Sequence, residues 1–197
     1  MTDLNDALAQ LATNGQARTL RFERRFRQAP DKVWAALTVP ARIEAWLYAR
    51  DIEIEPRVGG RYHLRFTNSD HEMENVITRW EPETVFEHSF GGPDSLVCWT
   101  VTPDGDGTRL TLTHRIAEAD QTMTLRTLAG WHDVLAQLDA GLEGRTRGWD
   151  VKVWEGFQTR YAEAYGSTDT PEGDLIPRGD RAEIRYERRL GHPVAKV

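Results

Sequence analysis

The sequence of 197 residues contains one cysteine, Cys98. A single cysteine excludes an intrachain disulfide and a thiolate-built metal site, and it favours a reducing compartment. No stretch of about 18 apolar residues is present, so we expect no transmembrane helix. Residues 1–11 alternate apolar and acidic side chains and lack the basic start and apolar middle of a signal peptide. The sequence therefore predicts a cytoplasmic protein without a membrane span.

Other absences exclude classes of ligand and reaction. The formal net charge is −6, with basic residues interleaved among acidic ones, so a nucleic-acid partner is not expected. No glycine-rich nucleotide motif and no Gly-x-Ser-x-Gly nucleophile elbow occurs, so we assign no cofactor and no catalytic residue. Metal-ligand spacing is missing among His63, His71, His88, His114 and His132. We therefore expect no metal either.

Tryptophan, in contrast, is abundant, with seven residues. Large aromatic side chains are costly to leave exposed, so they belong to a core or to a pocket wall. Hydrophobic residues make up 39% of the chain and charged residues 28%, which is typical of a globular domain with a sizeable core.

The first part of the chain predicts a helix, a strand and a helical elbow. Apolar residues within 3–12 have helical spacing, so we expect a leading helix inside residues 1–18 that ends at Asn14-Gly15. Residues 19–28 alternate apolar and charged side chains, which is typical of a strand. Pro30 and Pro40 each begin a short helix, and the second is expected to extend through Leu47.

The middle of the chain predicts an antiparallel meander. Six segments with a period of two are separated by short turn sequences: 51–55, 60–67, 73–80, 84–90, 95–102 and 108–115. A long helix follows from the N-cap Asp120 to about Glu143, and Gly144 ends it. Its apolar stripe consists of Leu125, Leu128, Trp131, Leu135, Leu138 and Leu142. A second amphipathic helix is expected over 150–165.

These elements predict an α+β helix-grip fold: a strand, two short helices, a six-strand antiparallel meander and a long C-terminal helix, with flanking helical extensions. The helix covers the apolar face of the curved sheet. A curved sheet and a straight helix diverge at one end, and the elbow can roof the gap. Apolar cavities in such places are the usual small-molecule sites.

The C-terminal tail repeats the start of the domain. Residues 185–197 match residues 21–33 with a gap of one residue, beginning with Arg-Tyr-Glu-Arg-Arg against Arg-Phe-Glu-Arg-Arg. Either the tail begins a second, truncated copy, or the match is chance or local convergence. We accordingly divide the chain into a leading helix (1–18), a helix-grip domain (19–143), a helical extension (144–166) and a linker with tail (167–197). The tail and the exposed sheet edges leave a homodimer or a tandem second domain open.

Six segments within 19–143 carry a resemblance to a known family. They are APDKVWAAL at 29–37, ARIEAWL at 41–47, VGGRY at 58–62, WEP at 80–82, DGDGTRLTLTH at 104–114 and GWHDVLAQL at 130–138. The sequence resembles the SRPBCC (START/Bet v-like) superfamily, and within it the homologues of the activator of heat-shock-protein-90 ATPase. The resemblance implies the helix-grip fold. It carries over no catalytic motif, because the family spans co-chaperones, lipid carriers and cyclases.

Strand parity and the helix stripe predict the cavity lining. It consists of Trp46, Tyr62, Leu64, Phe66, Phe86, His88, Phe90, Trp99, Leu112, His114, Leu128, Trp131 and Leu135. His88 and His114 are then polar groups in an apolar wall, and each is either a ligand contact or a satisfied core histidine. Three functions stay open. The first is binding of a small apolar molecule, the second a co-chaperone-like protein interaction, and the third a cyclase- or hydrolase-like reaction on a cavity histidine. We favour the first, and an enzyme is the less favoured reading.

Overall fold

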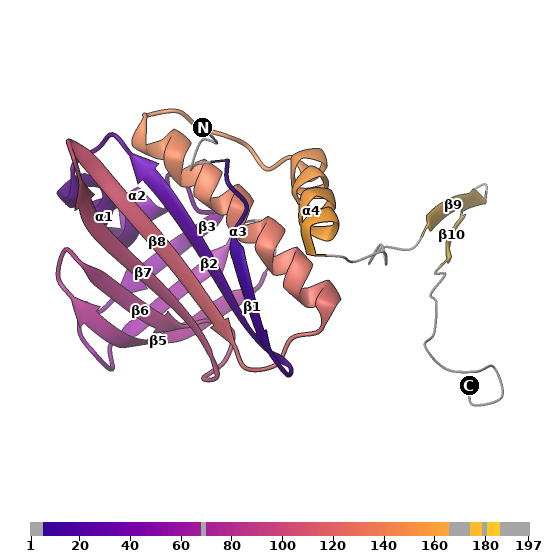
Figure 1. The fold of residues 1–197 in the computed structure, drawn as a ribbon, viewed down its shortest axis with the longest axis horizontal. Helices are drawn as coiled ribbons and strands as arrows, with labels where there is room; N and C mark the ends of the chain where they lie inside the picture. Colours follow the sequence, from indigo (N-terminus) through magenta and orange to yellow (C-terminus); the bar gives the residue numbers. More distant parts are fainter. Residues whose placement is uncertain (1–5, 68–69, 166–173, 179–180, 186–197) are drawn as a thin grey trace. The chain divides into compact units, whose positions relative to one another are not determined.

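The computed structural model of the chain describes residues 6–67, 70–165, 174–178 and 181–185. Its contacts divide the chain into two units, Met1–Tyr161 and Ala162–Val197, which are described separately. The first unit has the predicted α+β helix-grip fold, with one curved antiparallel sheet and a long helix packed on it (Figure 1).

The sheet of the first unit has eight strands. They are β1 (Gln10–Asn14), β2 (Ala17–Phe26), β3 (Ala49–Ile54), β4 (Arg61–Phe66), β5 (Glu72–Glu81), β6 (Val85–Ser89), β7 (Ser95–Asp104) and β8 (Gly107–Ile116). Their spatial order is β1-β2-β8-β7-β6-β5-β4-β3, with every pair antiparallel. The six predicted meander strands are confirmed as β3 to β8. The early strand β2 pairs with β8, the last strand of the meander.

The predicted leading helix is wrong in the described residues. Gln10–Asn14 is strand β1, which pairs with β2 from Gln10↔Arg21 to Asn14↔Ala17. Gly15 begins the two-residue turn at φ +59°, a backbone conformation that suits glycine and matches the twist of a tight hairpin. Asn14-Gly15 is therefore a hairpin signal rather than a helix stop. Residues 1–5 lie outside the described residues.

The helical elbow joins β2 to β3. Helices α1 (Pro30–Thr38) and α2 (Pro40–Ile43) both begin at the predicted prolines, where the missing amide hydrogen costs nothing. Helix α2 ends at Ile43, before the predicted Leu47. The indole Nε1 of Trp46 donates to the Ala36 carbonyl over 2.9 Å and fixes the turn that follows α2.

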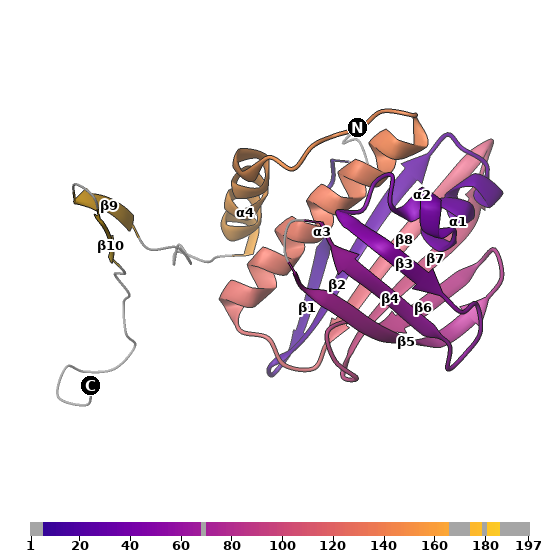
Figure 2. The ribbon, with the colours of Figure 1, turned by 180° about the vertical axis from the view of Figure 1, so that it is seen from behind.

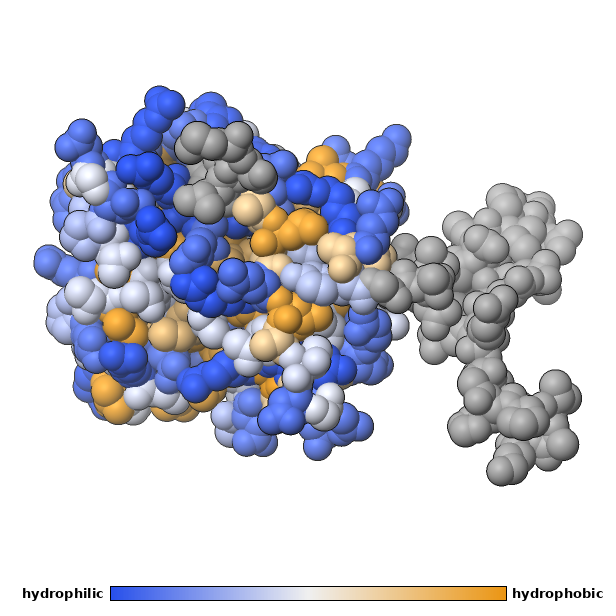
Figure 3. All heavy atoms as spheres, in the orientation of Figure 1, coloured by the Kyte–Doolittle hydropathy of each residue, from blue (hydrophilic) through white to orange (hydrophobic). Residues whose placement is uncertain are grey.

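Helix α3 (Gln121–Leu142) crosses one face of the sheet and packs on β2 and α1 (Figures 1 and 2). The predicted N-cap is confirmed, because the Asp120 carboxylate accepts a hydrogen bond from the Met123 amide over 2.7 Å. No described helix is long and apolar enough to span a bilayer. The face of the molecule seen in Figure 3 is mainly hydrophilic with scattered apolar side chains.

Helix α4 (Val151–Tyr165) docks through a buried aromatic cluster on α3. The Tyr161 side chain is fully buried, and its hydroxyl accepts from the Ala9 amide and hydrogen-bonds His132 Nδ1 over 2.9 Å. Phe157 stacks on the His132 ring with centroids 4.2 Å apart. Burial, reinforced by nearby arginine charge, lowers the pKa of His132 to about 3. Helix α4 up to Tyr161 thus packs on α3 within the first unit.

The second unit contains a hairpin, β9 (Asp174–Arg178) and β10 (Arg181–Arg185). The register runs from Asp174↔Arg185 to Arg178↔Arg181. Apart from Arg185, the tail segment 185–197 that repeats the start of the domain lies outside the described residues.

Candidate functional site: an aromatic cavity

A cavity of about 270 Å³ lies between the sheet and α3, on the side of the strands β4, β6 and β7. Its lining is formed by Leu37, Ile43, Trp46, Leu47, Tyr48, Tyr62, Leu64, Phe66, Phe86, His88, Phe90, Trp99, Thr127, Gly130, Trp131, Val134 and Trp149. None of these residues is charged at neutral pH. The elbow and the loop after α3 supply the parts of the wall that the sheet and α3 leave open.

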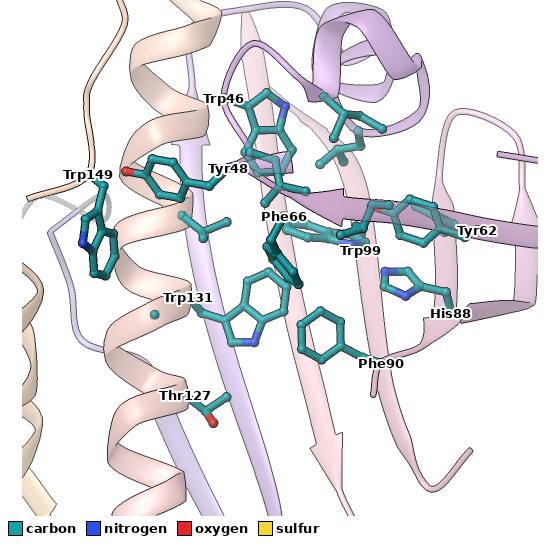
Figure 4. Close-up of a pocket in the computed structure, with 17 residues that line it drawn as sticks. Trp46, Tyr48, Tyr62, Phe66, His88, Phe90, Trp99, Thr127, Trp131 and Trp149 are labelled. Atoms are coloured by element: carbon teal, nitrogen blue, oxygen red, sulfur yellow. The ribbon is translucent and has the colours of Figure 1, made fainter. Parts of the chain in front are cut away.

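Aromatic rings build most of this wall. Trp99 packs edge-to-face against Trp46, with centroids 6.3 Å apart, and against Trp131, with centroids 5.6 Å apart. Phe90 lies 5.3 Å from the Trp131 ring. Figure 4 shows these rings and Phe66 arranged around a common space. Edge-to-face contacts fix the rings relative to one another, so the wall is rigid and apolar.

The structure brings together nine of the thirteen predicted lining residues: Trp46, Tyr62, Leu64, Phe66, Phe86, His88, Phe90, Trp99 and Trp131. The other four do not line the cavity. Leu112 of β8 and Leu128 and Leu135 of α3 are buried in the core. His114 is buried behind Trp131 and Phe90, in contact with both rings.

Sequence reasoning missed the lining residues that come from the elbow, from the side of α3 outside its hydrophobic stripe and from the loop after α3. They are Leu37, Ile43, Leu47, Tyr48, Thr127, Gly130, Val134 and Trp149. One signal was available in Gly130, since a glycine inside a helical pattern usually has a packing or functional reason. A Cβ placed on Gly130 would meet no atom within 4 Å, so the missing side chain leaves part of the cavity empty.

His114 is a satisfied core histidine. The Trp131 indole Nε1 donates to His114 Nδ1 over 2.9 Å, so Nδ1 must carry the lone pair. Nε2 then carries the proton and donates to Ser95 Oγ over 2.8 Å. Burial lowers the pKa of His114 to about 4. Both ring nitrogens are used, so this imidazole orients Trp131 and has no atom left for a ligand.

His88 is different, because only one of its nitrogens has a partner. Nδ1 lies 2.7 Å from the Ser89 carbonyl oxygen, which can only accept, so Nδ1 carries the proton. Nε2 therefore carries the lone pair, and no described residue donates to it. The ring points from β6 into the aromatic wall, 4.7 Å from the Tyr62 ring (Figure 4). Burial lowers the pKa of His88 to about 4, so the imidazole is neutral at pH 7.

Tyr48 and Trp149 form the rim of the cavity. Trp149 lines the cavity and yet is 48% exposed, and its ring meets the Tyr48 ring edge-on at 5.7 Å. The Tyr48 hydroxyl donates to the buried Asp133 carboxylate over 3.2 Å. Burial raises the pKa of Asp133, although Tyr48 and Arg147 oppose the change. The Asp133 carboxylate, which does not line the cavity, thus holds the Tyr48 side chain at the rim.

Within the described residues, no group of three or more histidine, cysteine, aspartate or glutamate side chains could hold a metal ion. Cys98 is half-buried on β7, with Sγ 4.0 Å from Thr100 Oγ1, and it lies outside the cavity lining. The chemistry available in the cavity is therefore apolar contact together with one imidazole acceptor and the hydroxyl groups of Tyr48, Tyr62 and Thr127.

Solved structures with this architecture come from several bacteria. The conserved protein of unknown function EF2215 from Enterococcus faecalis superposes with a TM-score of 0.68 at 17% identity, covering 82% of this chain and 92% of that one. CalU16 from Micromonospora echinospora gives a TM-score of 0.61 at 25% identity, covering 81% and 96%. DynU16, a protein of the dynemicin biosynthetic locus, gives 0.59 at 24% identity, covering 67% and 50%. These likenesses support the fold.

A comparison with curated proteins found no match. A comparison with protein families matched residues 27–143, from the end of β2 to the end of α3, to the family described as Activator of Hsp90 ATPase homolog 1-like protein. The matched region contains both short helices, the complete meander and the long helix that enclose the cavity. The chain therefore belongs to the Activator of Hsp90 ATPase homolog 1-like family, within the SRPBCC superfamily.

Proposed function

We propose that this protein binds a small, mainly apolar molecule in the cavity between the sheet and α3. The observation that carries the proposal is an aromatic cavity of about 270 Å³ whose lining contains no lysine, arginine, aspartate or glutamate. An apolar cavity of about 150 Å³ accepts benzene, so this one suits a ligand of about two fused rings. DynU16 belongs to a biosynthetic locus, and from it we take only the expectation that the ligand is a metabolite.

The test uses naphthalene as a probe of the expected size. Four tryptophans line the cavity, so occupancy should change the intrinsic fluorescence, and ligand binding to the native state must raise the melting temperature. Both signals should saturate at the same naphthalene concentration.

The matched variants exploit Gly130. Gly130→Leu places a side chain in the cavity from α3, where a Cβ meets no atom within 4 Å, so naphthalene binding should be lost while the domain stays folded. Gly130→Ala adds one methyl group and should retain most of the binding. Gly156→Ala, at an exposed and equally open position of α4, controls for the gain in helix propensity and should bind as the wild type does.

Two outcomes count against the proposal. One is that naphthalene and larger two-ring hydrocarbons leave the melting temperature unchanged. The other is that Gly130→Leu binds naphthalene as tightly as Gly156→Ala does, which would place the probe outside the cavity.

A reaction on a cavity histidine is the weaker alternative. His114 has both nitrogens engaged by Trp131 and Ser95, so His88 is the remaining candidate base. No carboxylate or hydroxyl nucleophile is among the lining residues apart from Tyr48, Tyr62 and Thr127. A co-chaperone role rests on the family name alone, and an ATPase assay with the cognate chaperone tests it. We propose a cytoplasmic location on the strength of the single cysteine.

A further inference from the structure

Nε2 of His88, in the cavity wall, is a hydrogen-bond acceptor that no described residue uses. His88 is 2% exposed, and its Nδ1 proton is already donated to Ser89. A polar atom in an apolar cavity wall is stabilised when a ligand supplies its hydrogen-bond partner. The other buried histidines, His63, His114 and His132, each hydrogen-bond a neighbouring side chain. The imidazole that lines the cavity is thus the exception.

We propose that the ligand is an uncharged molecule of about two fused rings that donates one hydrogen bond, as a phenol does, to Nε2 of His88. This inference rests on the proposed function and names its ligand class. The tautomer sets the direction of the bond, because Nδ1 holds the proton and Nε2 can only accept. Ethers and hydrocarbons of the same size fit the cavity but leave Nε2 unpaired.

Carboxylates are excluded by the same wall. An ionised carboxylate would leave water for a cavity without a lysine or arginine, and a neutral Nε2 acceptor would repel its oxygens. Burial keeps the pKa of His88 near 4, so the ring offers no positive charge to such a ligand at neutral pH. The site therefore differs from a fatty-acid site, in which a cation or several donors would meet the head group.

Three probes of nearly equal shape separate these cases: 2-naphthol, 2-methoxynaphthalene and 2-naphthoate. We expect 2-naphthol to bind about 3- to 10-fold more tightly than the ether, as one net hydrogen bond allows, and 2-naphthoate to bind more weakly than either. Quenching of the cavity tryptophans at pH 7.5 measures all three affinities.

Two further measurements assign the preference to His88. His88→Phe keeps a ring of similar size without the acceptor, so the ratio of 2-naphthol to ether affinity should fall to about one, and ether binding shows that the variant is folded. Independently of any variant, the ¹⁵N resonance of His88 Nε2 in the wild type should have the unprotonated position. It should move when 2-naphthol is added and stay when the ether is added.

The outcomes separate the two proposals. If none of the three probes binds, the proposed function fails with this inference. If 2-naphthol and the ether bind equally to the wild type, the cavity binds apolar molecules but His88 does not select a donor. Preferential binding of 2-naphthoate, or an Nε2 that is already protonated, would also overturn the inference.

A second observation, independent of the cavity, concerns the hairpin of the second unit. Residues 174–190 align without a gap onto residues 10–26, and the two hairpins have equivalent registers. Asp174↔Arg185 corresponds to Gln10↔Arg21, and Arg178↔Arg181 corresponds to Asn14↔Ala17. The sequences agree at Gly179 with Gly15 and at the Arg-Tyr/Phe-Glu-Arg-Arg motif.

We infer that residues 174–190 are a second copy of the opening hairpin of the helix-grip domain. The buried positions Leu20, Phe22 and Phe26 are matched in the sequence by Ile184, Tyr186 and Leu190, so the copy retains the apolar sequence pattern of β2. Pro177 falls on a position of β1, an edge strand, where a proline is tolerated.

A graft tests this inference. In the full chain, the sequence of residues 174–190 replaces residues 10–26, and a control carries the same residues in shuffled order. We expect the graft to unfold cooperatively, with the circular dichroism of the wild type and a lower melting temperature, and the shuffled control to lose cooperative unfolding. A graft that behaves like the shuffled control would overturn the inference.

Discussion

Trp131 and His132 are neighbours on α3, yet they face two regions of opposite construction. His132 faces the side that packs on Tyr161 and Phe157, where the aromatic rings are in contact and the tyrosine hydroxyl meets the imidazole. Trp131 faces the aromatic cavity, where its indole borders empty space. One helix thus provides both a packed side and a hollow side within the same turn.

This difference teaches where function should be sought. A native core is filled to crystal-like density, so a large empty volume is retained only where something else occupies it or where it can be tolerated. The hollow side also contains His88, which has no side-chain hydrogen-bond partner, whereas His132 on the packed side hydrogen-bonds the Tyr161 hydroxyl. Empty volume and an unused acceptor occur together on the same side of α3.

Acid should produce the largest effect, because it acts on both sides. The pKa values of His88 and His114 lie near 4 and that of His132 near 3, below the value of about 6.5 in an unfolded chain. The stability that the neutral histidines give the folded state is complete above pH 6.5 and is lost as the pH falls towards 4. In this range the histidines of the unfolded state bind protons, whereas the buried histidines of the folded state do not. Each histidine contributes about 1.4 kcal/mol per pH unit in this window.

Urea unfolding at pH 7.5, 5.5 and 4.5 measures this loss. Burial raises the pKa of Asp133, so this carboxylate takes up its proton at a higher pH in the folded state than in the unfolded state. It therefore offsets the effect of at most one histidine proton on the free energy of unfolding. A free energy of unfolding that stays constant between pH 7.5 and 5.5 would show that the three imidazoles are not held neutral by burial.

Leu135 and Val134 give the next largest effect and compare the two sides directly. Leu135→Ala removes a side chain that is 1% exposed in the packed core and should cost about 2–5 kcal/mol, because the structure cannot close the void. Val134→Ala trims a side chain that already borders empty space and should cost about 1 kcal/mol. Urea unfolding at pH 7.5 measures both.

For ligand binding, we expect the larger change from Val134→Ala and the smaller one from Leu135→Ala. Val134→Ala enlarges the cavity and should improve binding of a three-ring hydrocarbon relative to naphthalene, whereas Leu135→Ala should leave that ratio unchanged. Equal losses of stability in the two variants would mean that the hollow side is packed in solution.

Much of the fold and the sheet half of the cavity could be predicted from the sequence. Strand parity is a strict rule, because successive side chains point to opposite faces, and the four strand residues Tyr62, Phe86, His88 and Trp99 that it put on one face line the cavity. The leading helix failed because four apolar residues fit helical spacing by chance. The pairing of β1 with β2 outweighed that local pattern.

The helical half of the cavity could not be predicted by the same reasoning. A hydrophobic stripe identifies the side of a helix that packs best, and Leu128 and Leu135 are accordingly in the core. A cavity forms where side chains are small, so Thr127 and Gly130 mark it instead. The rim residue Trp149 lies in a loop, where no periodicity exists to indicate its direction.

Trp149 should produce the smallest effect on stability. Its side chain is 48% exposed and belongs to neither the packed core nor a helix, so Trp149→Ala should change the free energy of unfolding by about 0.5 kcal/mol or less. It nevertheless lines the cavity and meets the Tyr48 ring at 5.7 Å, so its loss opens the rim to water. Stopped-flow fluorescence should show naphthalene dissociating several-fold faster.

Val151 supplies the matched control for this prediction, because it is 50% exposed two residues further along the chain and does not line the cavity. Val151→Ala should leave the dissociation rate of naphthalene unchanged. If both variants release the probe at the wild-type rate, ligand exchange does not pass Trp149. The probe would then enter and leave the cavity at another place. The two sides of α3 would differ in their empty volume alone, and not also in a rim formed by the loop after α3.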